Sequence, residues 1–262
     1  MTERKRYPED HWARDGEAGS ALRKYLKLYE DPFNEVKLRI YERLLPADLT
    51  GKTVMDVGGG AGMMTVTCAR KGARVTLLDA EASALNTARH FARREGVEER
   101  VSAVHSDRIP EEVLRQRFDI IIAKDIVEHI PDDQTFIKQL AQCQKPGGLL
   151  LLSTQNSRSL TYLIEGSYNK YRLNNPDWCG WDTTHLRFYT AGSLRTLLEN
   201  AGYRVDKWRS VYLVPYDILS WVFLLRLKII LPGLKWIDLL AGHIPPFNRL
   251  GWNLVLAARL AP

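Results

Sequence analysis

Cysteine is scarce in this 262-residue chain, and its placement excludes two kinds of protein. The three cysteines, Cys68, Cys143 and Cys179, lie far apart and form no C-x-x-C pair. A disulfide framework needs paired cysteines and a structural zinc site needs closely spaced ligands, so we expect neither. The pattern favours a reducing compartment, and we expect a cytoplasmic protein.

Long apolar runs are also missing. In the most apolar segment, Tyr216–Leu240, the longest uncharged run is Ile218–Leu225, which is too short to span a bilayer. Met1–Asp10 carries three basic residues with no apolar stretch after them, so we expect neither a secretory signal nor a membrane anchor there. Most of the net charge of +6 lies in residues 201–262, where the cations alternate with Leu and Ile. That alternation argues against a nucleic-acid-binding stripe.

Short apolar segments alternate with amphipathic helical segments from residue 52 onward. We predict strands at Thr53–Val57, Arg74–Leu78, Val101–His105, Phe118–Ala123, Leu149–Ser153, Tyr203–Leu213 and Trp252–Ala258. Crossovers of this length place helices on both faces of a mainly parallel sheet, so the expected fold class is α/β, doubly wound and Rossmann-like. The ligand crevice of such a sheet lies at the carboxyl ends of its strands.

The pattern divides the chain into four parts. They are an N-terminal helical arm (1–50), a cofactor-binding core (51–155), a cap insertion (156–189), and a C-terminal part of the core (190–262) with a hydrophobic insert at 214–240. Helices are predicted at Asn34–Leu45 and Ala191–Ala201. The hydrophobic insert could pack against the core, form a homodimer interface, or lie on a membrane surface and contact lipid.

A glycine-dense turn follows the first strand, in the segment VMDVGGGAG (Val54–Gly62). Glycines there let a ligand approach the backbone more closely than any Cβ would allow. The spacing is D-x-G-x-G-x-G, and Met63 stands where a dinucleotide fold would need its third glycine. The carboxylate of Asp56 would repel a pyrophosphate, so a cationic or amino-bearing ligand suits this turn better.

Acidic residues also end the second and third strands. Asp79 stands where a Rossmann-like fold places a carboxylate on a ribose diol. Asp107, in the turn His105-Ser106-Asp107, could accept a hydrogen bond from an exocyclic amine. These positions suggest a ligand with a ribose and an adenine.

Together these motifs resemble the class I S-adenosylmethionine-dependent methyltransferases. The resemblance is carried by VMDVGGGAG, LLDA, HSD, FDIIIAKDIVEHIPD and KPGGLLLLST, and it covers Lys52–Ser153 closely. It implies a seven-stranded methyltransferase sheet with S-adenosylmethionine as the cofactor. It places cofactor contacts at Asp56, Gly58, Gly60, Gly62, Asp79, Ala80, Asp107, Arg108 and Lys124.

A D-x-x-E-H sequence follows the fourth strand and holds Asp125, Glu128 and His129 within about one helical turn. It is similar to the ubiquinone-biosynthesis O-methyltransferases, in which an E-x-x-E-H set is associated with a divalent cation, within the wider type 11–23 methyltransferase group. The resemblance implies a site for Mg²⁺, Mn²⁺ or Zn²⁺ at these three residues, with a shorter reach at Asp125. Alternatively the Glu-His pair caps the turn, and His129 is then a candidate general base.

A second histidine, His185, stands in the segment WDTTHLRFY, which resembles the H-x-R-F segment of sugar, lipid and small-molecule methyltransferases. His185 could face the acceptor, or Asp182 and Thr183 could cap a turn while His185 bonds buried backbone. The cap also supplies aromatic side chains that could cover a planar or apolar acceptor, at Tyr162, Tyr168, Tyr171, Trp178 and Trp181.

The sequence therefore predicts a methyltransferase that methylates an oxygen of a small aromatic, quinone-like or lipid-linked acceptor. Its candidate catalytic residues are His129, His185 and Asp125. Two alternatives stay open: an N-methyltransferase of a small molecule, and a membrane-peripheral binding module with an idle cofactor fold.

Overall fold

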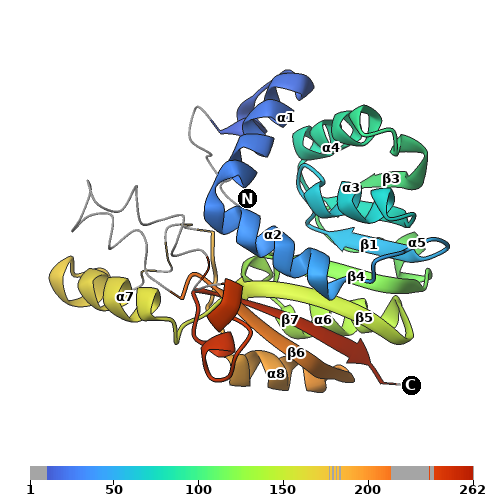
Figure 1. The fold of residues 1–262 in the computed structure, drawn as a ribbon. Helices are drawn as coiled ribbons and strands as arrows, with labels where there is room; N and C mark the ends of the chain where they lie inside the picture. The colour runs from blue at the N-terminus through green and yellow to red at the C-terminus, as the bar shows by residue number, and fades with distance from the viewer. Residues whose placement is uncertain are drawn as a thin grey trace.

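The computed structural model describes residues 11–176, 178, 180, 182, 184–213, 236 and 239–261. Within them one sheet has the strand order β3-β2-β1-β4-β5-β7-β6 (Figure 1). Its strands are β1 (Thr53–Val57), β2 (Arg74–Asp79), β3 (Val101–His105), β4 (Phe118–Lys124), β5 (Gln144–Gln155), β6 (Tyr203–Val211) and β7 (Asn253–Leu260). Strands β1 to β5 pair in parallel, and β7 is antiparallel to both β5 and β6. The predicted seven-stranded, mainly parallel sheet is confirmed.

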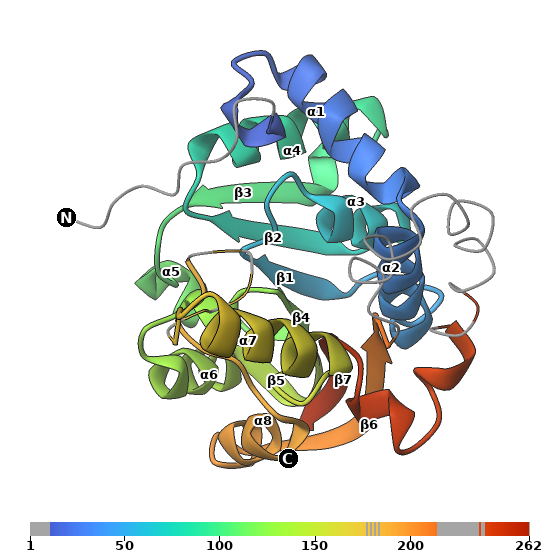
Figure 2. The same ribbon diagram turned by 90° about the vertical axis from the view of Figure 1, so that its left-hand side faces the viewer.

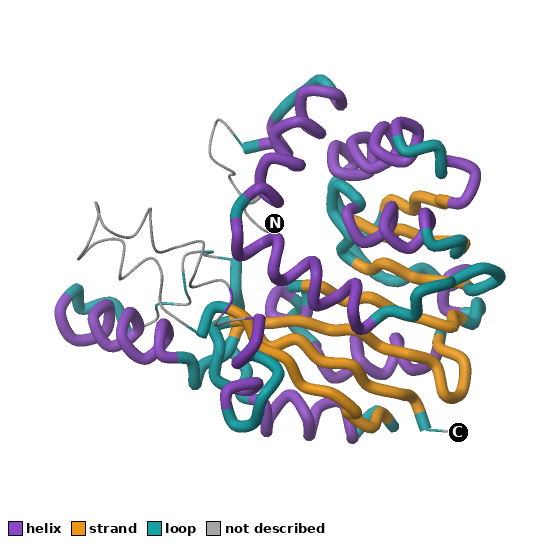
Figure 3. Tube along the Cα trace, in the orientation of Figure 1, coloured by secondary structure: helices purple, strands orange, loops and turns teal. Residues whose placement is uncertain are grey.

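Central strand β4 shows why this sequence forms a covered parallel sheet. Ile120 and Ile122 point to one face and Ile121 to the other, and all three are buried. A strand buried on both faces is a continuous apolar run instead of an alternating one. Helices must therefore cover both sides of the sheet (Figure 3).

One face is covered by four helices, two of which come from the predicted arm. These are α1 (Ala18–Lys27), α2 (Pro32–Leu44), α3 (Met63–Arg70) and α4 (Ala82–Arg94). Ile40 and Tyr41 of α2 are fully buried, so α2 is part of the core. The other face is covered by α5 (Glu111–Leu114), α6 (Asp133–Gln142) and α8 (Ala191–Glu199).

Two features of the structure differ from the prediction for identifiable reasons: the start of one strand and a helix in the cap. Strand β5 begins at Gln144, five residues before the predicted Leu149, because Gln144 already pairs with Phe118 despite the turn-like Pro146 that follows it. The cap, for which no helix was predicted, contains helix α7 (Leu160–Arg172), which projects from the body of the molecule (Figures 1 and 2). The Ser159 hydroxyl begins this helix by accepting a hydrogen bond from the Tyr162 amide at 3.0 Å.

The hydrophobic insert 214–240 lies almost entirely outside the described residues, as do Cys179, Trp181 and Thr183. Among the residues described, no helix is both long and apolar enough to cross a membrane. Cys68 and Cys143 are buried free thiols.

Candidate active site

The glycine turn after β1 is bound by hydrogen bonds to the end of strand β2. Gly58 and Gly60 have φ values of +66° and +57°, in the left-handed region that favours glycine. The Asp79 carboxylate accepts hydrogen bonds from the amides of Gly60 at 2.8 Å and Glu81 at 2.9 Å. A Cβ on Gly60 would meet nothing within 4 Å, so the turn presents bare backbone to an open space.

Gly62 differs from the other glycines of the motif. It begins α3 with a φ of +86°, and a Cβ on it would approach the Cβ of Ala88 to 2.9 Å. It lines neither of the two cavities at the turn. The structure therefore shows a packing role for this glycine between α3 and α4, and its cofactor contact stays a prediction.

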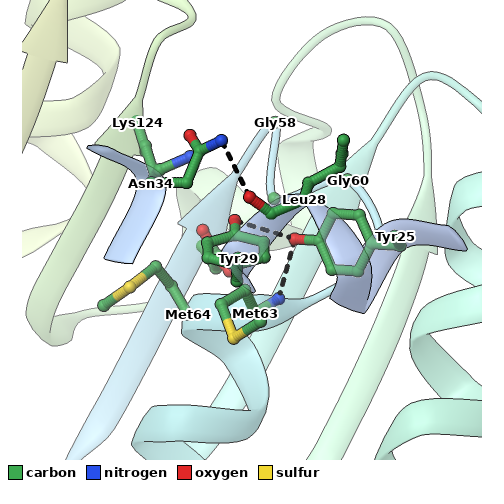
Figure 4. Close-up of a pocket in the computed structure, with 11 residues that line it drawn as sticks. Tyr25, Leu28, Tyr29, Asn34, Gly58, Gly60, Met63, Met64 and Lys124 are labelled. Atoms are coloured by element: carbon green, nitrogen blue, oxygen red, sulfur yellow. Dashed lines mark hydrogen bonds between the residues drawn. The ribbon is translucent and has the colours of Figure 1, made fainter. Parts of the chain in front are cut away.

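A cavity of about 230 Å³ lies over the turn. The core supplies Asp56, Gly58, Gly59, Gly60 and Lys124, and the arm supplies Tyr25, Tyr29 and Asn34 (Figure 4). The Tyr25 hydroxyl accepts a hydrogen bond from the Met63 amide at 3.3 Å and lies 3.2 Å from the Tyr29 hydroxyl. These arm residues could not be identified from the sequence, because one-turn spacing of two tyrosines is ordinary in any helical segment.

The first cavity contains groups that can carry opposite charge. Asp56 is buried and accepts a hydrogen bond from the Thr65 hydroxyl at 2.7 Å, and burial raises the pKa of its carboxyl to about 6. Burial alone would lower the pKa of Lys124, but Tyr29 and nearby carboxylates raise it above its ordinary value. The ammonium therefore stays charged.

A second cavity, of about 750 Å³, lies along the carboxyl ends of β2, β3 and β4. Five of the predicted cofactor residues line it: Gly58, Asp79, Ala80, Asp107 and Arg108. The candidate catalytic residues Asp125 and His129 line it too, beside Ile126, Ile130 and Phe136. Gly58 lines both cavities, so they meet at the glycine turn.

Asp125 is held by a buried network that the sequence did not reveal. It has a φ of +52°, forms an ion pair with Lys37 of α2, and accepts a hydrogen bond from the Ser153 hydroxyl at 2.8 Å. Lys37 also donates to Asn253 Oδ1 at 2.7 Å. Burial lowers the pKa of Lys37 to about 8. Burial alone would raise the pKa of Asp125, but Lys37 and Lys124 hold it below its usual range.

The metal site expected at Asp125, Glu128 and His129 is not assembled in that form. Potential ligand atoms of Glu128, His129 and His185 lie within 4.8 Å of one another, and Asp125 is not in this group because its carboxylate is bound to Lys37. The imidazole rings of His129 and His185 have centroids 4.8 Å apart. In the described structure, the three potential ligands that lie close together thus include His185 and not Asp125.

Glu128 is fully buried within this group. One carboxylate oxygen accepts a hydrogen bond from the Thr154 hydroxyl at 2.8 Å, and the other has no hydrogen-bond partner in the described part of the chain. Burial, and then the charge of Asp125, raise the pKa of Glu128 to about 8. A buried carboxylate oxygen without a partner is rare and indicates a place where a cation or a donor group would be stabilised.

The cap contributes an aromatic cluster beside the two histidines. Phe188 lies 5.9 Å from the His185 ring, 4.8 Å from Tyr162 and 5.5 Å from Trp252, measured between ring centroids. The Trp178 and Tyr162 rings are tilted relative to each other, with their centroids 5.8 Å apart. Two of the predicted cap aromatics, Tyr162 and Trp178, are therefore in the cluster, whereas Tyr168 and Tyr171 are exposed on α7.

The strand order, the glycine turn and the acidic strand ends define a Rossmann-like methyltransferase fold. The family described as "Methyltransferase domain" matches residues 29–207. The chain belongs to this family. Family and fold support S-adenosylmethionine as the cofactor.

The chain is also similar to individual proteins. The ubiquinone biosynthesis O-methyltransferase of Coxiella burnetii (strain Dugway 5J108-111) is 35% identical over 142 residues, which are 53% of this chain and 59% of that protein. The protein of the same name from Aeromonas salmonicida (strain A449) is 29% identical over 171 residues, which are 64% of this chain and 69% of that protein. The chain thus matches only 59% of the length of the first relative.

Solved structures share the fold at low sequence identity. An S-adenosylmethionine-dependent methyltransferase from Mesorhizobium loti has a TM-score of 0.55 at 16% identity, covering 86% of this chain and 97% of that one. One from Aquifex aeolicus has a TM-score of 0.58 at 14% identity, covering 94% and 100%. A cyclase, SpnF, has a TM-score of 0.58 at 19% identity, covering 95% and 85%. The fold alone therefore does not determine the reaction.

Proposed function

We propose that this protein transfers a methyl group from S-adenosylmethionine to an oxygen of a small aromatic, quinone-like or lipid-linked acceptor. The observation that carries the proposal is the meeting of two cavities at Gly58, one bounded by Asp56 and Lys124 and the other by Asp79 and Asp107. The names of the relatives support oxygen as the methylated atom. N-methylation of a small molecule remains the alternative.

The residues present fit this donor. The bare backbone at Gly60 leaves room for it, and the charges in the first cavity suit an amino acid end, with the carboxylate toward Lys124 and the ammonium toward Asp56. Asp79 already accepts two amide hydrogen bonds, and a carboxylate has about four lone-pair sites, so two remain for ribose hydroxyls. Asp107 lies at the next strand end, in reach of the same ligand.

The chain's own residues then have two tasks. When bound, the donor supplies a methyl carbon that is electrophilic because it is attached to a sulfonium. The protein aligns an acceptor oxygen with that carbon, and alignment alone can supply much of the rate. His129, which lines the second cavity, accepts the proton that the acceptor hydroxyl must lose.

A pair of glycine variants tests donor binding. Gly60→Ala would place a methyl group in the open space where the donor is expected, without meeting any protein atom within 4 Å. Gly51→Ala is the matched control, because Gly51 also has a positive φ, of +75°, and open surroundings, but lies outside the site. Each substitution should cost about 1 kcal/mol of stability through its backbone conformation.

Calorimetry with S-adenosylmethionine and its demethylated product is the measurement. We expect Gly60→Ala to weaken binding at least about tenfold, which is about 1.4 kcal/mol, and Gly51→Ala to leave it unchanged. Asp79→Ala should also weaken it. Equal effects of the two alanines, or no binding of the donor by the wild type, would refute the proposed cofactor site.

In a second form of this proposal, Glu128, His129 and His185 bind a divalent cation in place of the set with Asp125, and His129 is then a ligand of the cation and not the proton acceptor. The support is their mutual proximity and the unpartnered oxygen of Glu128. Two imidazoles favour Zn²⁺ or Mn²⁺ over Mg²⁺ as the ion. A cation there would lower the pKa of an acceptor hydroxyl.

Electron paramagnetic resonance titration with Mn²⁺ tests this cation site. We expect His185→Ala to abolish a site that Asp125→Asn retains. If Asp125→Asn lost Mn²⁺ binding and His185→Ala retained it, the ligands would be those predicted from the sequence, with Asp125 and not His185. If the wild type gave no signal of bound Mn²⁺, the proposed manganese site would be refuted.

The alternative is a membrane-peripheral module with an idle cofactor fold. Methyl transfer to an acceptor distinguishes the proposed enzyme from this module. Its sequence basis, the insert 214–240, lies almost entirely outside the described residues. An acceptor screen with labelled methyl donor, run beside liposome co-sedimentation, distinguishes the two. Lipid binding without methyl release on quinone-like and phenolic acceptors would favour the module.

A further inference from the structure

Helix α7 of the cap has an outward face lined by large apolar side chains. Five of them recur at three- and four-residue intervals and are between 41% and 74% exposed: Leu160, Leu163, Ile164, Tyr168 and Tyr171. Residues at these intervals share one side of a helix, so they form a single apolar stripe. A continuous apolar area on a protein surface indicates a place where another surface binds.

The opposite side of α7 packs on the protein. The Tyr162 ring lies 4.8 Å from that of Phe188 and 5.8 Å from that of Trp178, measured between centroids. Gly166, one turn after Tyr162, lies so close to Trp178 that a Cβ on it would be 3.4 Å from the indole ring. These contacts anchor the helix, and they leave the apolar stripe on the side that faces away from the protein.

Basic residues border the apolar stripe along both edges. Lys170 stands seven residues after Leu163, and Arg172 stands four residues after Tyr168. Because these spacings are close to whole helical turns, the two cations continue the two edges of the stripe. Both side chains are exposed. Long cationic side chains in such positions extend past their apolar neighbours to reach a charged partner.

The one acid of α7 lies away from the stripe. Glu165 is three residues after Tyr162 and therefore belongs to the side that packs on the protein. Residues 157–173 contain three basic residues and one acid, a net charge of +2. The outward face of α7 thus combines apolar area with positive charge. A homodimer through this face would place two positively charged faces against each other, which disfavours a second copy as the partner.

We propose that α7 docks on the surface of a bilayer that contains anionic lipid. The apolar stripe lies among the upper acyl chains, and Lys170 and Arg172 contact the lipid phosphates. The helix has 13 residues, which is too short to span the hydrocarbon core, so it lies along the surface. Tyr168 and Tyr171 have the amphipathic rings that favour the headgroup region. This surface is separate from the insert 214–240.

Docking through α7 would bring the candidate active site to the lipid. The helix begins five residues after β5 ends, and the Ser157 amide between them donates to the Tyr189 carbonyl oxygen at 2.8 Å. Because β4 and β5 are parallel, α7 starts at the sheet edge that also borders the larger cavity. An acceptor dissolved in lipid would then lie near that edge. The docking itself does not depend on methyl transfer.

Co-sedimentation with vesicles tests the charged edges of the stripe, with no methyl donor present. The vesicles contain equal parts of phosphatidylglycerol and phosphatidylcholine, and phosphatidylcholine alone is the neutral comparison. We expect the wild type to prefer the anionic vesicles and to bind them less tightly at high salt. Lys170→Gln/Arg172→Gln should weaken this binding about thirtyfold, because each cation near an anionic surface contributes about fivefold.

A matched control removes two cations elsewhere. Arg74 begins β2 and Arg115 lies three residues before β4, so both stand at the opposite edge of the sheet, and both are exposed. Arg74→Gln/Arg115→Gln should leave vesicle binding unchanged. Equal loss in the two double variants would mean that net charge and not α7 determines binding, and would overturn the proposal.

A second variant tests the apolar stripe. Leu163→Ser/Tyr171→Ser should weaken binding at least about tenfold, and its urea midpoint should stay close to that of the wild type because both side chains are exposed. No binding of the wild type to anionic vesicles, or equal binding by this variant, would overturn the proposal. So would a wild-type dimer in sedimentation velocity that this variant dissociates, if vesicles are not bound. Methyl transfer without vesicle binding would refute the docking alone.

Discussion

The ion pair between Lys37 and Asp125 is the clearest place to perturb the molecule. Lys37 is 6% exposed in its side chain and Asp125 is 26% exposed, and the pair joins helix α2 to the turn after β4. Lys37→Met keeps the length of the aliphatic stem and removes the charge. Asp125 would then lose its principal counter-ion while its hydrogen bond from Ser153 remains.

The cost follows from the burial of the pair. Removing one partner of a buried ion pair costs about 3–5 kcal/mol, because the remaining charge is left uncompensated. Lys124 stays 3.6 Å from the Asp125 carboxylate, and that carboxylate borders a cavity, so we expect the lower end, about 3 kcal/mol. The double variant Lys37→Met/Asp125→Asn leaves no uncompensated charge and should recover about 2 kcal/mol of this loss.

Urea unfolding followed by tryptophan fluorescence at pH 7 measures both values. Lys24→Met is the matched control on the neighbouring helix, because Lys24 pairs with Asp15 at 2.8 Å but is 46% exposed. That exposed pair should contribute less than about 1 kcal/mol. A loss in Lys37→Met no larger than in Lys24→Met, or no recovery in the double variant, would show that the buried pair does not stabilise the fold.

Two further substitutions test single residues of the glycine turn. Burial raises the pKa of Asp56 from 3.8 to about 6, so the resulting stabilisation is complete below pH 3.8 and is lost as the pH rises through 6. In urea titrations, the free energy of unfolding of the wild type should therefore fall by up to about 3 kcal/mol relative to that of Asp56→Asn between pH 4 and 7. A difference between the two proteins that stays constant with pH would contradict this. Gly62→Ala should cost about 2–3 kcal/mol because its Cβ meets Ala88, while the affinity of the folded protein for the donor, measured by calorimetry, stays unchanged. Weakened binding would support the cofactor contact that the motif implies for Gly62.

Much of the fold could be predicted because its signals are local. Strand β3 matches its predicted bounds, and the acids that end β2 and β3 line one cavity because parallel strands bring their carboxyl ends to one edge. Helix α7 was missed because the cap has no apolar periodicity facing a core. Its Leu163 and Ile164 are exposed in the described structure.

The contacts that complete the site could not be predicted, because they join distant residues without a motif. Lys37 and Asp125 are 88 positions apart, and nothing in the spacing of α2 distinguishes Lys37 from a solvated lysine. The D-x-x-E-H segment predicted three ligands within one helical turn. Asp125, however, has a positive φ, so the backbone from Asp125 to His129 is not one regular helical turn. His185 comes close to Glu128 and His129 because the cap contacts the turn after β4, where the Leu186 amide donates to the Glu128 carbonyl oxygen at 2.9 Å.

The meeting of the two cavities at Gly58 also bears on the order in which ligands bind. Tyr25 and Tyr29 of the arm border the smaller cavity, and α2 is tied to the core by Lys37, so a donor is expected to enter through the larger cavity. It must then pass the place proposed for the acceptor. We therefore expect sequential kinetics, in which the donor binds first and the demethylated product leaves last.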